Sequence, residues 1–164
     1  MEKQTPTVNT GLRGVTVAST RISDVDGNAG KLIYRGYLVK DLAEKSTFEE
    51  VAHLLLHDRL PARDELERFA AFLADARPVP EALMAALGTL PPETAPMDVL
   101  QAAVAMLAAY DPDLTERSFE NEQRRAARLT ARLATVAAAW HRIREGRDPV
   151  PPDPALGQAA NFLY

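Results

Sequence analysis

The chain has 164 residues, 46% hydrophobic and 26% charged, with a formal net charge of −4, a balance typical of a one-domain soluble globular protein. It has no cysteine, which excludes a disulfide framework, a thiolate zinc site and a cysteine nucleophile. No apolar run follows the first charged residues, and the longest one, 102–110, is far shorter than the roughly 20 residues that cross a bilayer. We therefore expect a cytoplasmic protein with no membrane partner.

The amino-terminal part predicts a flexible leader over residues 1–10 and a β-hairpin at about residues 15–36. Val, Thr, Ile and Tyr, which favour strands, lie on both sides of the glycine-containing stretch 26–30, which suits a turn. Because two strands alone are only marginally stable, we expect the hairpin to pack against helices.

The following segments predict helices. Thr47 and Glu50 have the spacing of a capping box at the start of one of them. Proline near the first turn and apolar residues three and four positions apart mark the others. The predicted helices lie at residues 41–45, 48–57, 63–76 and 80–88.

The predicted helix at residues 97–110 is apolar on nearly all sides, since Asp98 and Gln101 are its only strongly polar residues. A helix that is apolar all round needs to be buried all round. In a domain this small, this requirement suggests that a second subunit covers one face. We predict a homodimer whose interface contains Met97, Leu100, Val104, Leu107 and Tyr110.

A long helix follows, capped by Ser118 and ending at Gly146, with apolar residues at helical spacing. The stretch 117–147 holds eight arginines against three glutamates, a net charge of +5, so that the rest of the chain carries −9. Such a basic stripe can bind nucleic acid, but arginines on a long amphipathic helix more often form its solvated face. We favour the solvated face and expect no nucleic-acid partner.

The last predicted elements are a proline-rich linker at 148–154 and the opening of another helix at 155–164. Because apolar Phe162 and Leu163 come directly before the final residue, we expect the sequence to be cut from a longer one.

His53 and His57 lie one helical turn apart, a spacing that can bind zinc, and Glu49 could add a third ligand. The zinc-protease pattern needs a glutamate directly after the first histidine, where this chain has Leu54. Most such histidines are hydrogen-bonded core residues. We therefore expect no metal site.

Other catalytic patterns are missing from the sequence. His141 stands alone near a helix end, where an interaction with the helix dipole is the expected role. There is no dinucleotide-binding glycine motif, no P-loop and no serine elbow. We expect no catalytic and no cofactor-binding residue in this chain.

Taken together and in order, ten short motifs resemble the bacterial and archaeal citrate synthases. They are Gly11-Leu-Arg-Gly14, Ile22-Ser-Asp-Val-Asp-Gly27, Gly30-Lys-Leu-Ile-Tyr-Arg-Gly-Tyr37, Asp41-Leu-Ala43, Ser46-Thr-Phe-Glu-Glu-Val-Ala52, Leu54-Leu-Leu56, Leu60-Pro61, Pro96-Met97-Asp-Val-Leu100, Asp111-Pro112 and Ala159-Ala-Asn-Phe-Leu-Tyr164. The resemblance covers residues 11–164. It implies an all-α fold with a small amino-terminal hairpin, part of the family's large helical domain. It also implies a homodimer and the condensation of acetyl-CoA with oxaloacetate, in which acetyl-CoA is a substrate and no cofactor takes part.

The same resemblance implies that the family's catalytic residues, two histidines and an aspartate, lie downstream of the motif that ends at Tyr164. The small domain, the oxaloacetate-binding arginines and the coenzyme A site lie there too. We therefore predict an amino-terminal fragment of a citrate synthase that is inactive by itself. One alternative is a stand-alone, non-catalytic helical module for dimerisation or interaction, derived from the same fold. Another is a nucleic-acid binder that uses the arginine-rich helix.

Overall fold

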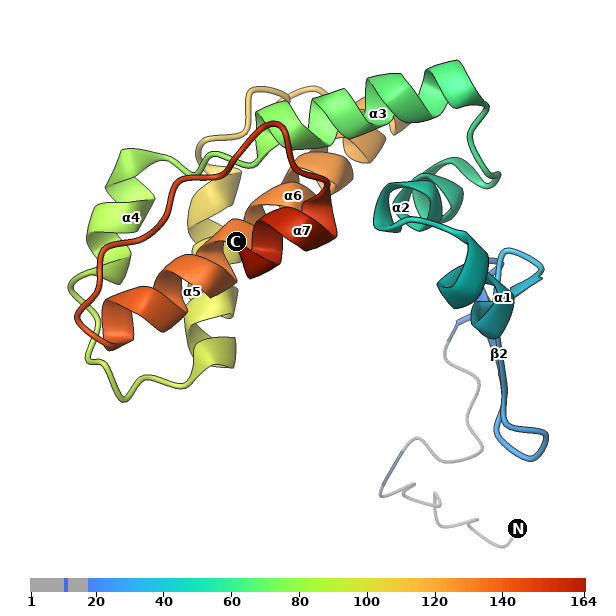
Figure 1. Ribbon diagram of the computed structural model, residues 1–164, viewed down its shortest axis with the longest axis horizontal. Helices are drawn as coiled ribbons and strands as arrows, with labels where there is room; N and C mark the ends of the chain where they lie inside the picture. The colour runs from blue at the N-terminus through green and yellow to red at the C-terminus, as the bar shows by residue number, and fades with distance from the viewer. Residues whose placement is uncertain (1–10, 12–17) are drawn as a thin grey trace, which may run out of the picture.

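The computed structural model describes residue 11 and residues 18–164 (Figure 1). The predicted leader at 1–10 and the start of the predicted hairpin lie outside these residues. The described part consists of seven helices and one three-stranded sheet, so the prediction of a mainly helical fold with a small amino-terminal hairpin is confirmed. The elements are β1 (Ser23–Asp26), β2 (Lys31–Tyr34), β3 (Tyr37–Leu38), α1 (Val39–Lys45), α2 (Phe48–His57), α3 (Arg63–Ala76), α4 (Glu81–Leu87), α5 (Pro96–Ala108), α6 (Phe119–Arg144) and α7 (Gln158–Leu163).

The sheet is antiparallel, with β2 between β1 and β3. The predicted turn joins β1 to β2, and its first side chain shapes it. Asp26 Oδ1 accepts hydrogen bonds from the backbone N–H groups of Asn28 (3.1 Å) and Ala29 (2.9 Å). Strand β3 was not predicted. It follows a tight reversal at Arg35 and Gly36, both of which have positive φ (47° and 90°).

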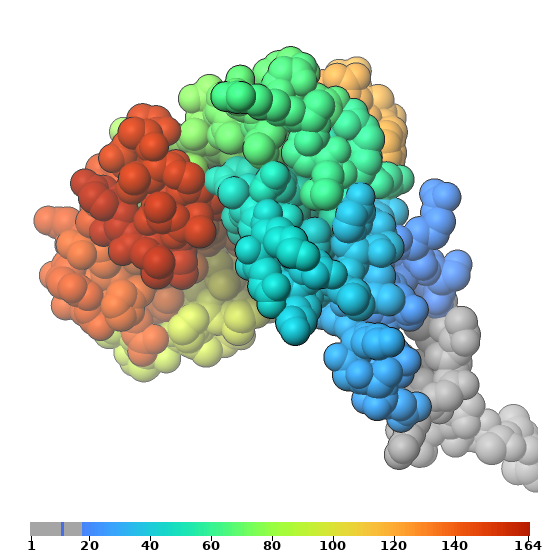
Figure 2. All heavy atoms as spheres, turned by 45° about the vertical axis from the view of Figure 1, so that its right-hand side comes forward, coloured from blue at the N-terminus to red at the C-terminus, as the bar shows by residue number. Residues whose placement is uncertain are grey.

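The sheet projects from the helical body, as the blue end of the chain shows in Figures 1 and 2. Its helical contacts are mainly with α1. Arg35 provides a second attachment, because its guanidinium donates to the Leu55 carbonyl (3.2 Å) and pairs with Asp58 (2.5 Å), just after α2. The expected packing of the hairpin on helices is therefore limited in extent.

The predicted capping box at α2 is confirmed. Thr47 Oγ1 accepts a hydrogen bond from the Glu50 backbone N–H (3.2 Å), and the Glu50 carboxylate accepts one from the Thr47 N–H (2.7 Å). The helix ends at Asp58, whose φ of 67° is left-handed. At α3, Glu65 accepts a hydrogen bond from the backbone N–H of Ala62 (2.8 Å) and so satisfies one free donor of the first turn.

Helix α6 is the central element and contacts α2, α3, α4, α5 and α7 (Figure 1). One core cluster joins α6 to α4 and α5 and contains Leu83, Leu87, Val99, Ala103, Leu107, Val136 and Trp140. A second joins α6 to α3 and contains Phe69, Leu73, Ala76, Ala127 and Ala131. Small alanines on α6 leave room for the larger side chains of α3. No described helix combines the length and apolarity needed to cross a membrane.

Candidate functional site

The apolar helix α5 is buried on one face only. Val99, Ala103 and Leu107 point into the core with 4% exposure or less. On the other side, Val104 is 36% exposed and Met97 is 72% exposed. The face of α5 that points away from the core is thus exposed and mostly apolar.

The five residues predicted to form a dimer interface are therefore divided. Met97, Val104 and Tyr110 are exposed, whereas Leu107 belongs to the core of the same chain. Leu100 is partly buried and packs against that core. Of the three exposed residues, Met97 and Val104 lie on α5, and Tyr110 follows the end of the helix.

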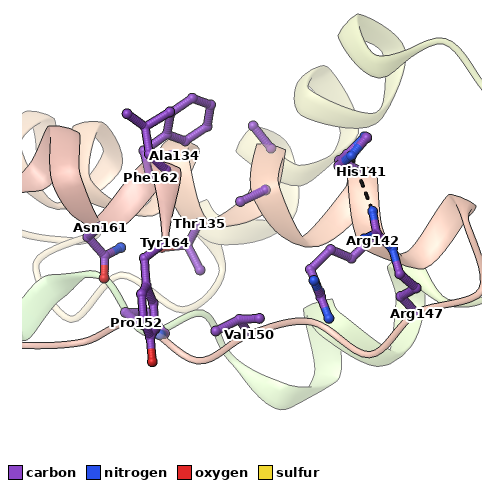
Figure 3. Close-up of a pocket in the computed structure, with 13 residues that line it drawn as sticks. Ala134, Thr135, His141, Arg142, Arg147, Val150, Pro152, Asn161, Phe162 and Tyr164 are labelled. Carbon is purple, nitrogen blue, oxygen red and sulfur yellow. Dashed lines mark hydrogen bonds between the residues drawn. The ribbon is translucent and has the colours of Figure 1, made fainter.

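A pocket of about 350 Å³ lies between the second half of α6, the returning linker and α7. Figure 3 shows Asn161 and Tyr164 at one end of it and His141 and Arg147 at the other. The hydroxyl of Thr135, which also lines the pocket, is buried without a hydrogen-bond partner. None of the described residues that line the pocket is an aspartate or a glutamate, so these side chains offer no acidic general base.

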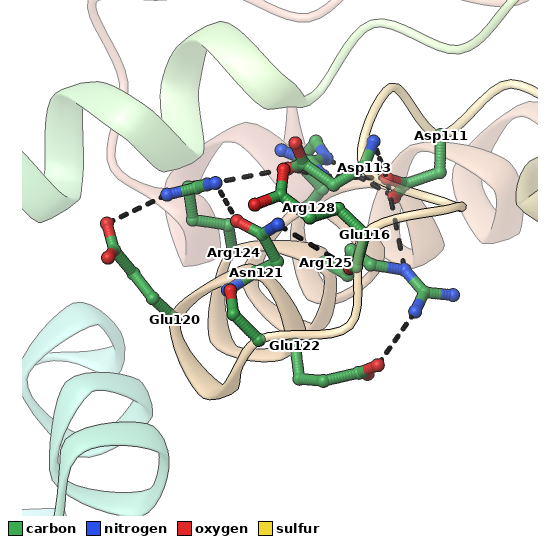
Figure 4. Close-up of polar contacts among 10 residues, drawn as sticks. Asp111, Asp113, Glu116, Glu120, Asn121, Glu122, Arg124, Arg125 and Arg128 are labelled. Carbon is green, nitrogen blue, oxygen red and sulfur yellow. Dashed lines mark hydrogen bonds and ion pairs between the residues drawn. The ribbon is translucent and has the colours of Figure 1, made fainter.

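Three arginines in the first half of α6 form ion pairs with the loop that precedes the helix (Figure 4). Arg128 contacts Asp111 (2.7 Å) and Asp113 (2.6 Å), and its side chain is only 11% exposed. Arg124 also reaches Asp113 (3.4 Å), and Arg125 approaches Asp111 (3.9 Å). The prediction of a solvated arginine face is wrong for Arg128, because Asp111 and Asp113 neutralise it beneath the loop.

This arrangement lowers the pKa values of both aspartates. Burial alone would raise the pKa of Asp111, but hydrogen bonds and charge from Arg128, together with the charge of Arg125, outweigh that effect. The pKa of Asp113 falls chiefly because of its hydrogen bond from Arg128, helped by the one from Arg124. The two aspartates are therefore ionised anchors for the α5–α6 loop and poor proton acceptors at neutral pH.

His53 and His57 lie side by side on α2, with ring centroids 4.4 Å apart. Both rings also meet Phe69 of α3 edge-on, at 5.4 and 5.8 Å. Burial, followed by the nearby charge of His53, lowers the pKa of His57. The two histidines and Glu65 line one open pocket on the surface of α2 and α3. Hydrogen bonds from Arg59 and from the Ala62 backbone lower the pKa of the Glu65 carboxyl group to about 2.

Glu49, the third ligand considered for zinc, has another role. Its carboxylate accepts a 2.6 Å hydrogen bond from the backbone N–H of Gln158, at the start of α7. Within residue 11 and residues 18–164, no group of three or more His, Cys, Asp or Glu side chains could hold a metal ion. His141 contacts Glu145 (3.6 Å) and Arg147 (3.4 Å) near the end of α6, remote from the other two histidines in sequence.

A buried polar network was not predicted. Arg77, only 1% exposed, donates to Gln158 Oε1 (2.8 Å) and to the Asp153 carbonyl (2.9 Å). Gln158 in turn donates to the Ala131 carbonyl (3.1 Å) of α6. Asn161 accepts a hydrogen bond from the Asp153 backbone N–H (2.7 Å). The network positions α7 and the linker, but no pattern near Arg77 in the sequence indicated its distant partners.

Comparisons with known proteins agree on one family. A family model described as "Citrate synthase, C-terminal domain" matches residues 11–164. The citrate synthase of Haloferax volcanii is 41% identical over 160 residues, which cover 94% of this chain and 42% of that protein. A 2-methylcitrate synthase of Mycobacterium tuberculosis is 40% identical over 159 residues, covering 97% of this chain and 40% of that protein. The chain thus spans less than half the length of these curated relatives.

A solved structure supports the same similarity. The crystal structure of citrate synthase from Pyrobaculum aerophilum superposes with a TM-score of 0.84 at 35% sequence identity. The superposition covers 99% of this chain and 46% of that one.

Proposed function

Because the chain belongs to the citrate synthase family, we propose that it is the scaffold portion of an enzyme that condenses acetyl-CoA with oxaloacetate to give citrate and CoA. The observation that carries this proposal is the family match over residues 11–164, together with the shared helical fold. The lack of cysteine suits a reducing compartment, and we place the enzyme in the cytoplasm.

The chain by itself is inactive in this proposal. The condensation removes a proton from the methyl group of the thioester, and the enol then attacks the ketone of oxaloacetate. These steps need a carboxylate base and a donor to the thioester oxygen, both placed at one substrate site. Glu65, next to the histidine pair, has a pKa of about 2 and is already occupied by Arg59, so it is a poor base.

A CoA-release assay tests this proposal. The purified chain, produced in a host lacking its own citrate synthase, is incubated with acetyl-CoA and oxaloacetate, and free thiol is followed over time. We expect no release above the protein-free blank, while a full-length relative in the same assay is active. Release that scales with chain concentration and requires oxaloacetate would contradict inactivity.

The exposed face of α5 favours a second role, as a surface for homodimerisation. Met97 and Val104 on the helix, and Tyr110 just after its end, present exposed apolar area. We expect sedimentation equilibrium to show that the chain self-associates as its concentration rises. Val104→Glu should raise the dissociation constant at least tenfold, because it would bury a charge in the interface. Val25→Glu, on the exposed hairpin, is the matched control and should leave it unchanged. A chain that stays monomeric throughout would contradict this role.

A further inference from the structure

The histidine pair on α2 presents two imidazoles to the same space. His53 and His57 are four positions apart and so share one helix face. Their ring centroids are 4.4 Å apart, and Phe69 holds both rings from the side. Zinc binds histidine nitrogens at about 2.0–2.1 Å, so two nitrogens on one tetrahedral ion are roughly 3.4 Å apart. The 4.4 Å between the ring centroids shows that the two imidazoles are neighbours, as a shared ion requires.

A backbone contact favours one tautomer of His53. Its Nδ1 lies 3.0 Å from the carbonyl oxygen of Arg59. A carbonyl oxygen can only accept a hydrogen bond, so Nδ1 carries a hydrogen, and in the neutral imidazole the lone pair is then on Nε2. Histidines that bind metals are oriented in the same way, with the non-ligating nitrogen donating to a carbonyl or carboxylate.

The two rings line an open pocket of about 450 Å³. The cations that share this pocket are already paired with carboxylates. Arg59 contacts Glu65 (2.5 Å), and Arg68 contacts Asp64 (2.9 Å). Each of these two cations therefore has a carboxylate partner.

The sequence alone led us to expect no metal site at His53 and His57. The geometry instead points to an exchangeable two-histidine site for a borderline transition-metal ion such as Zn²⁺, held by Nε2 of His53 and a ring nitrogen of His57. Water fills the remaining positions, since the described residues offer no third imidazole or free carboxylate there. Imidazole ligands select Zn²⁺, Ni²⁺ and Cu²⁺ over Mg²⁺ and Ca²⁺, which prefer oxygen. The site is independent of the proposed condensation.

Calorimetric titration of the tag-free chain with Zn²⁺ at neutral pH tests the site, with NMR of the imidazole protons as the second readout. We expect one equivalent to bind and to shift the signals of His53 and His57 only. A large excess of Mg²⁺ should leave binding unchanged. His57→Ala, at a partly exposed position, should weaken binding at least tenfold.

His141→Ala is the matched control, because this third histidine is exposed and has no histidine neighbour on its helix face. It should bind Zn²⁺ as the parent chain does. Unchanged affinity in a folded His57→Ala variant would overturn the inference, as would equal losses in both variants or the absence of Zn²⁺ binding by the parent chain.

Discussion

Two threonines of α6 differ in whether their side-chain hydroxyl group makes a hydrogen bond. Thr130 Oγ1 donates to the Ala126 carbonyl one turn earlier (2.8 Å), whereas the Thr135 hydroxyl is buried without a partner. A buried hydroxyl that makes no hydrogen bond keeps its desolvation cost of about 1–3 kcal/mol.

Thr135→Val should therefore leave the free energy of unfolding unchanged or raise it by up to about 1 kcal/mol, since valine has the same shape without the unpaired hydroxyl. Thr130→Val, the matched control on the same helix, should lower it by about 0.5–1.5 kcal/mol by removing a hydrogen bond. Urea unfolding of the two variants measures both. A clear loss of stability in Thr135→Val would mean that its hydroxyl is paired.

Arg77 is a buried cation whose hydrogen-bond acceptors are a side-chain amide and a backbone carbonyl. Arg77→Met keeps most of the volume but leaves Gln158 Oε1 and the Asp153 carbonyl without their donor. We expect the free energy of unfolding to fall by about 2–4 kcal/mol. We also expect the amides of α7 to lose hydrogen-exchange protection before those of the other helices. Arg144→Met, at an exposed position on α6, should change stability by no more than about 0.5 kcal/mol. A similar effect of both variants would argue against the network.

Among the elements, the loop between α5 and α6 depends on the pairing of Asp111 and Asp113 with Arg128. Both aspartates have lowered pKa values in the folded chain, whereas in the unfolded chain their pKa is the ordinary one of about 3.9. When the pH is lowered, the unfolded chain therefore binds protons at these aspartates before the folded chain does. The contribution of the two aspartates to the free energy of unfolding is complete above the unfolded pKa. It is lost as the pH falls through their lower pKa values in the folded chain.

The pH dependence tests this pairing. We expect the free energy of unfolding to fall as the pH drops below about 4, and Arg128→Gln to show a smaller fall because its aspartates titrate closer to their ordinary values. Arg68→Gln, whose pair with Asp64 is highly exposed, should keep the pH dependence of the parent chain. Parallel curves for the parent and Arg128→Gln would rule out this role for Arg128.

Local signals in the sequence predicted most of the elements. The Thr47 and Glu50 capping box and the Ser118 cap depend on residues three apart, so their partners could be found by spacing alone. Strand β3 was missed because its two residues carry no alternation, and the reversal before it uses a positive φ at Arg35.

Distant pairings could not be predicted in the same way. Arg77 meets Gln158 only after the chain has passed through α4, α5 and α6, a separation of 81 residues. The burial of Arg128 likewise depends on how the α5–α6 loop folds over the helix. Helical periodicity marks an apolar face, but it does not show which arginines on the other face are covered.

At the scale of the whole molecule, the described residues divide into a helical body around α6 and a small unit made of the sheet and α1. The body contains both core clusters, whereas the sheet has exposed side chains such as Val25 (69%) and Tyr37 (43%). Little apolar area is therefore removed from water when the sheet docks.

We expect this difference to appear as two levels of local stability. In native-state hydrogen exchange, amides of β1 and β2 should exchange through an opening that costs less free energy than global unfolding, while those of α5 and the middle of α6 exchange only on global unfolding. Arg35→Gln removes the pair with Asp58 and should lower protection in the sheet and leave protection in α6 unchanged. Lys45→Gln, which breaks an exposed pair within α1, is the control and should change neither. If the sheet and α6 exchange at one common free energy in the parent chain, the molecule unfolds as a single cooperative unit and this division is wrong.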